Sequence, residues 1–105
     1  MKIDMPVERG GRASKNEFEK VDAIQLDALT LELSAPDGVL HGVVHCPAAA
    51  TGGRLPKDFT SNAMPGKEAI QSAIKLANDL KLVVVVLDPA ELWPESWGTL
   101  FIAED

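Results

Sequence analysis

Six consecutive apolar residues near the end of the chain constrain the fold more than any other feature. They run from Leu82 to Leu87 with the sequence LVVVVL, and four of the six are β-branched. Because β-branched side chains favour extended structure, the run predicts a strand at about residues 82–88. A strand with one face in water alternates apolar and polar residues, and this one does not. We therefore expect both of its faces to be covered.

The segment directly before this strand predicts the main helix, at about residues 65–80. Pro65 suits a first helical turn, because the N–H that proline lacks would be unpaired there. Apolar residues from Ala69 to Leu80 recur at three- and four-residue steps and form one stripe. Several of them are alanines, so the helix can lie close to a sheet. This helix is expected to cover one face of the strand and to leave the other open.

A β-hairpin is the clearest local pattern in the first half of the chain. Leucines at every second position from Leu29 to Leu33 predict a strand at about residues 28–34. The sequence Ala-Pro-Asp-Gly at 35–38 favours a turn, because proline sets φ and Asp and Gly close it. A second strand is expected at about residues 39–46. Two strands joined by such a turn predict antiparallel pairing.

The remaining segments complete an α+β domain. Residues 17–27 carry both helical and strand periodicity, and both structures stay open for them. Residues 98–103 are compatible with a short C-terminal strand. We expect a two-layer fold in which one main helix packs on a small, mainly antiparallel sheet. Residues 1–16 are expected to form a flexible N-terminal arm, and residues 17–105 a single domain.

Composition restricts the classes of function. The 105 residues include 10 Lys and Arg against 16 Asp and Glu, a net charge of −6. Nucleic acids and anionic membrane surfaces are bound through basic side chains, so both partners are disfavoured. No apolar run approaches the roughly 20 residues that span a bilayer, and the first residues lack the apolar core of a signal peptide. One cysteine excludes an internal disulfide framework, and we expect a cytoplasmic protein.

His41, His45 and Cys46 form one weak candidate group for ligand binding. The two histidines share a face of the predicted strand, about 13 Å apart at roughly 3.3 Å per residue. That separation is too large for one metal ion within a monomer, and Cys46 points to the other face. Surface or cross-strand histidines are the more ordinary interpretation. No metal site and no cofactor are predicted.

Two other positions are weak ligand candidates. Gly52-Gly53 followed by Arg54 can present backbone N–H groups and a guanidinium to an anion, but neither GxxxxGK[ST] nor GxGxxG occurs. Asp88 lies at the carboxyl end of the apolar strand, where α/β proteins often bind ligands. Because Pro89 follows it, a turn-forming aspartate is the more ordinary interpretation. The chain has no nucleophile motif such as GxSxG, and no catalytic residue is predicted.

The C-terminal segment is the most unusual candidate for a surface contact. Trp93 and Trp97 lie four residues apart, with Glu95 between them. Tryptophan is enriched at binding hot spots, so these three residues are candidates for an interaction site. The alternative, which we favour, is that both rings fold back over the sheet and supply missing cover.

Two classes of function follow. The first is a small soluble, non-catalytic interaction or assembly protein that acts as a homodimer, because a second copy commonly covers an apolar face. A protein partner bound through the acidic, Trp-bearing segment belongs to the same class. The alternative is a small ligand- or metal-binding enzyme subunit that uses the His41/His45/Cys46 strand and the Gly52-Gly53-Arg54 loop. The missing catalytic motifs favour the first class, and whether the protein is an enzyme stays open.

Overall fold

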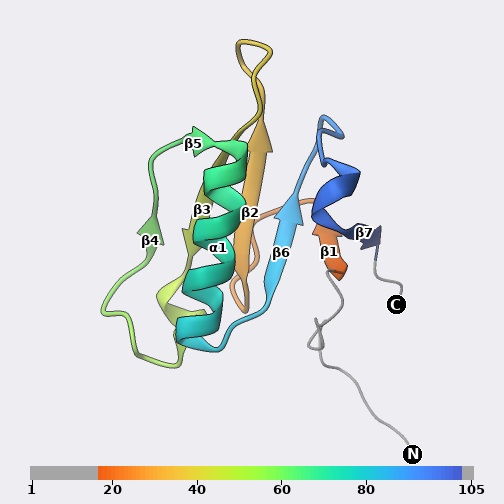
Figure 1. Cartoon of the computed structure of the whole chain (residues 1–105). Coiled ribbons are helices and arrows are strands. Elements are labelled where there is room, and N and C mark those ends of the chain that lie inside the picture. Colours follow the sequence, from red (N-terminus) through yellow and green to blue (C-terminus); the bar gives the residue numbers. More distant parts are fainter. Residues whose placement is uncertain (1–16, 103–105) are drawn as a thin grey trace, which may run out of the picture.

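The computed structural model describes residues 17–102, and Figure 1 shows the main helix packed along one face of a sheet. The expected flexible arm, residues 1–16, lies outside the described residues. The elements in chain order are β1 (Glu17–Val21), β2 (Leu29–Ser34), β3 (His41–Cys46), the 3-10 helix η2 (Ala48–Thr51), β4 (Phe59–Thr60), β5 (Met64–Pro65), α1 (Gly66–Leu80), β6 (Val84–Leu87), the 3-10 helix η3 (Glu95–Trp97) and β7 (Thr99–Ile102).

The sheet is mixed. Its strand order is β4-β3-β2-β6-β1-β7, and β5 also pairs with β3. The strands β2, β6, β1 and β7 are parallel to one another, whereas β3 is antiparallel to β2, β4 and β5. The α+β class with one helix is therefore observed. The expectation of a mainly antiparallel sheet is not confirmed, because the pairs β2–β6, β1–β6 and β1–β7 are all parallel.

The local predictions agree with the observed elements. The hairpin is present as β2 and β3, with Leu33 opposite Gly42, and the helix begins one residue later than expected. The apolar run forms β6, and the short C-terminal strand forms β7. In the ambiguous segment 17–27, the first five residues form strand β1. The helix ends at Leu80, and the next residue, Lys81, adopts the left-handed conformation (φ 60°) that glycine usually supplies at this position.

Helix α1 packs closely on the sheet through small side chains. Ala69, Ala73 and Ala77 are buried against β2, β3 and β6. At Gly42 the approach is so close that an added Cβ would lie 2.6 Å from the Cβ of Ala69. The register places Leu31 opposite Val44 and Val86, so these residues face the helix. This shared layer is the core of the protein.

Two crossover connections join parallel strands on opposite faces of the sheet. Residues 22–28 lead from β1 to β2 and pass behind β6, on the side away from α1 (Figure 1). There the N–H of Gln25 donates to Thr30 Oγ1 at 3.1 Å, and Thr30 and Val85 are fully buried. The second connection leads from β6 to β7 across β1 and carries η3. Because loop residues occupy the second face, the simple two-layer arrangement is not confirmed.

The two faces of β6 are covered by different parts of the chain. Val86 is buried on the helix side and Val85 on the crossover side, so the centre of the strand is enclosed as its composition predicts. Trp93 and Trp97 lie on the same side as α1: the Trp93 ring centroid is 5.3 Å from that of Phe18 on β1. A Cβ on Gly66, at the start of α1, would be 3.3 Å from the Trp97 ring. The tryptophans therefore extend the helix layer over β1 and do not cover the second face.

Candidate functional site

The predicted ligand strand does not form a ligand cluster. His41 and His45 lie on the sheet face away from α1 and make separate contacts. His41 Nδ1 is 2.8 Å from the carbonyl oxygen of Val39, and His45 Nε2 is 2.8 Å from Glu32 Oε1. Within residues 17–102, no group of three or more His, Cys, Asp and Glu side chains is arranged to hold a metal ion.

Cys46 and the glycine-containing loop lie apart from the histidine contacts. Cys46 is buried in the core beneath α1, on the face opposite to His45, and this desolvation raises the pKa of its thiol. Gly52 and Gly53 have φ values of 65° and 96°, which fit the turn after η2. Arg54 is exposed in this loop. The structure therefore separates the cysteine from the histidines and leaves Arg54 at the surface.

Asp88 organises the connection that follows β6. The residue is 1% exposed, and its carboxylate accepts the N–H of Leu92 at 2.8 Å and that of Trp93 at 2.9 Å. Its carbonyl oxygen accepts the N–H of Glu91 at 3.2 Å, which closes a turn around Pro89. Two backbone donors compensate the burial of the carboxylate. Asp88 thus sets the path of the chain toward Trp93.

The candidate interaction residues in the C-terminal segment have different surroundings. Trp93 and Trp97 are half-buried and meet edge to face, with ring centroids 5.3 Å apart. The indole N–H of Trp93 donates to the carbonyl oxygen of Gly98 at 2.9 Å. Glu95 is exposed between them. Both rings pack against the protein itself, and Glu95 is the member of the three that faces solvent.

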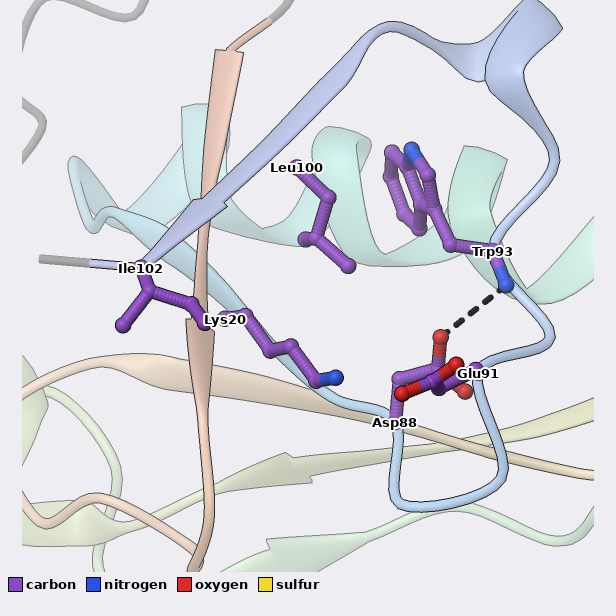
Figure 2. A pocket seen from close by; sticks show the side chains of 6 residues that line it. All are labelled: Lys20, Asp88, Glu91, Trp93, Leu100 and Ile102. Carbon is purple, nitrogen blue, oxygen red and sulfur yellow. Dashed lines mark hydrogen bonds between the residues drawn. The ribbon is translucent and has the colours of Figure 1, made fainter.

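A pocket that sequence reasoning missed lies beside Asp88. It has a volume of about 250 Å³. Figure 2 shows the side chains that line it, which are Lys20, Asp88, Glu91, Trp93, Leu100 and Ile102. These residues come from β1, from β7 and from the connection after β6. The pocket therefore lies toward the carboxyl ends of three adjacent parallel strands, where open α/β sheets commonly bind ligands.

Charges of both signs face this pocket. In Figure 2 the Lys20 ammonium points toward the carboxylates of Asp88 and Glu91. Nevertheless, none of the ion pairs within 4.0 Å in the described part of the chain includes Lys20. Lys20 faces the same side of the sheet as Phe18 and Val86, since it lies opposite Val86 in the register. A lysine on an otherwise apolar face of a strand can indicate a binding site. The sequence did not show this face, because it left residues 17–27 open between helix and strand.

Strand β7 forms one edge of the sheet. Among the described residues its pairing partner is β1 alone, which leaves its outer backbone groups without a strand partner there. Its sequence, TLFI, carries no charge and no proline. Ile102, at its end, is 72% exposed.

Comparisons of the chain with protein-family models, with curated proteins and with solved structures give no match. None of the helices in the described part of the chain is long and apolar enough to span a membrane.

Proposed function

We propose that this protein is a non-catalytic interaction protein that assembles as a homodimer through its edge strand β7. The observation that carries the proposal is the uncharged, apolar outer edge formed by Thr99–Ile102. An edge strand presents a row of backbone donors and acceptors to a further strand. Two β7 strands related by a two-fold axis would pair antiparallel and join the two sheets.

The two edges of the sheet differ in a way that supports this assignment. Natural proteins protect sheet edges with short strands, proline or lysine. The opposite edge follows this rule, since β4 and β5 have two residues each and β5 contains Pro65. Strand β7 has four residues and none of these protections. An edge of this kind is stable in water when a second strand covers it.

The sheet face away from α1 supports self-association less well than the edge does. Glu17 and Glu32 lie on this face, and the described strands place no Lys or Arg on it. A symmetric contact between two such faces would oppose like charges, which is unfavourable. The alternative of an enzyme subunit gains no support from the geometry, because His41 and His45 lie on the face opposite to Cys46. A cytoplasmic location is part of the proposal, because one buried thiol needs no oxidising compartment.

Sedimentation equilibrium of the wild-type chain and of two lysine variants tests the proposal. We expect the wild type to have twice the 11.2 kDa mass of one chain. The Ile102→Lys variant should be monomeric, because a lysine at the strand end must be desolvated when the edge pairs. Leu26→Lys is the matched control: Leu26 is also 72% exposed, but it lies in the crossover behind β6. This control variant should remain a dimer.

A monomeric wild type at about 0.1 mM would overturn the proposal, because a functional dimer needs a Kd well below that concentration. Dissociation by Leu26→Lys with an unchanged mass of Ile102→Lys would instead place the contact on the crossover face. Circular dichroism of both variants checks that each has kept the wild-type fold.

A further inference from the structure

We propose that the pocket beside Asp88 binds a small zwitterion with an apolar side chain, the chemical class of the free aliphatic amino acids. This inference does not depend on the homodimer, because all six lining residues belong to one chain. It rests on the arrangement of charge, on the apolar surface between the charges, and on the size of the space.

The charged groups of the pocket favour a ligand that carries one negative and one positive charge. Lys20 is half-buried on β1, and its ammonium is more than 4.0 Å from every carboxylate of the described residues. Glu91 lies across the pocket in the turn after β6. A ligand carboxylate at Lys20 and a ligand ammonium at Glu91 would pair both groups at once. A simple anion or cation would pair only one of them.

Asp88 contributes differently from Glu91. Both of its oxygens already accept backbone N–H groups, so it acts on the ligand mainly through its negative charge. Glu91 is exposed, and its backbone at φ 58° turns the chain beside the pocket. We therefore assign the direct contact with the ligand ammonium to Glu91. Together the two carboxylates make the lining net negative beside Lys20.

The remaining lining residues offer an apolar surface. Leu100 and Ile102 come from β7, and the Trp93 ring closes the opposite side (Figure 2). An aliphatic side chain packed between them would cover part of the exposed Ile102. The pocket is open to solvent, and its volume of about 250 Å³ admits a molecule of the size of leucine with part of that molecule exposed.

Titration calorimetry with three related molecules tests each charge separately. L-leucine carries both charges, leucinamide lacks the carboxylate, and 4-methylpentanoate lacks the ammonium. We expect leucine to bind about fivefold more tightly than either analogue, because each analogue loses one ion pair, and a pair with an exposed partner contributes up to about 1 kcal/mol. The Trp93 ring lines the pocket, so a change in tryptophan fluorescence should follow the same saturation curve.

Two variants assign the charges to residues. Lys20→Met should reduce the affinity for leucine to that for leucinamide, and it should leave leucinamide binding unchanged. Glu91→Gln should reduce the affinity for leucine to that for 4-methylpentanoate. Lys75→Met is the control, because Lys75 is exposed on α1 and pairs with Asp79 at 3.6 Å, away from the pocket. This control should bind leucine as the wild type does.

Three outcomes would overturn the inference. The first is no saturable heat with leucine up to about 10 mM, a concentration above the Kd of a useful site. The second is equal affinity for leucine and 4-methylpentanoate. The third is an equal affinity of the Lys20→Met and Lys75→Met variants for leucine. Lys20 lies opposite Ile102 in the β1–β7 pair, so sedimentation must show that the Lys20→Met and Glu91→Gln variants keep the mass of the wild type. With the mass unchanged, the ligand test is separate from that of the dimer.

Discussion

Two polar residues, Asp88 and Cys46, are each 1% exposed, yet their chemical environments differ. Asp88 is compensated by two backbone N–H donors, so burial and charge are compatible there. Cys46 lies among apolar core residues, where the charged thiolate is disfavoured. At the residue scale, Asp88 therefore builds a turn, whereas Cys46 serves as a small apolar side chain of the core.

Burial of Cys46 predicts a loss of stability at alkaline pH. In the unfolded chain its thiol titrates near its ordinary pKa of 9.0, and burial raises the pKa in the folded state. Above this ordinary value the unfolded chain releases its proton first, so unfolding becomes more favourable as the pH rises. We expect the free energy of unfolding to fall more in the wild type than in Cys46→Ala between about pH 8 and pH 10, with the one-proton limit of about 1.4 kcal/mol per pH unit as the largest possible difference in slope.

Urea unfolding followed by circular dichroism measures this difference. The two proteins share all other titrating groups, so these cancel in the comparison. Equal losses in both proteins would show that the thiol is solvated in the folded state. Reaction with a thiol reagent gives an independent measurement, and Cys46 should react much faster in urea than in the native protein, because the thiolate is the reactive form.

At the scale of elements, the contact between α1 and β3 determines how closely the helix lies on the sheet. Gly42 and Ala69 meet there without room for another methyl group. The buried alanines of the helix continue the same close approach along β2 and β3. The helix can therefore reach the sheet only because small residues lie on both elements.

A double-mutant cycle tests this contact. Gly42→Ala should lower the free energy of unfolding by about 1–3 kcal/mol, because its Cβ forces the helix outward. Ala69→Gly should cost about 1 kcal/mol through helix propensity. In the double variant the clash between the added methyl group at position 42 and residue 69 is relieved, because residue 69 is then glycine. The double variant should therefore lose about 0.5 kcal/mol or more less free energy of unfolding than the sum of the two single losses. Additive losses, measured by urea unfolding, would contradict a close contact at this position.

At the scale of the whole molecule, the parallel strands join distant parts of the chain. β1 pairs with β6 through residues such as Glu19 and Val85, which are 66 positions apart. β1 also carries β7 and the Trp93 ring. Consequently, the pocket and the position of β7 in the sheet both depend on β1, the first described strand.

The net charge of −6 predicts that salt stabilises the folded state. Excess like charge disfavours a compact state through self-repulsion, and salt screens this repulsion. We expect the melting temperature to rise by about 2–5 °C between about 0.02 and 0.3 M NaCl. Differential scanning calorimetry measures it, and KCl should give the same rise if screening is the cause. A fall in both salts would mean that attractive ion pairs outweigh the repulsion.

Several features of the fold were predictable because short-range patterns encode them. The alternating leucines and the Ala-Pro-Asp-Gly turn predicted β2 and β3, and the apolar stripe from Ala69 to Leu80 predicted α1. Each pattern depends on residues two to four positions apart. The β-branched run from Leu82 also predicted β6 and its burial from both sides.

The candidate site was less predictable than the fold. Asp88 was identified as a position at the end of a strand, and the pocket lies beside it; a ligand role for Asp88 stays a prediction. Lys20 and Glu91 were not identified, because nothing local relates a residue in β1 to a turn about 70 positions later. The parallel placement of β1 brings them together.

The sequence by itself determined the hairpin, the helix, the central strand and the negative charge of this protein, because near neighbours in the chain define each of them. Only the tertiary structure decided that β1 enters the sheet parallel to β6, that Trp93 and Trp97 join the helix layer, and that β7 forms an edge. The physical reason is that these arrangements follow from packing between distant segments, where burial and steric fit select among pairings that are locally equivalent.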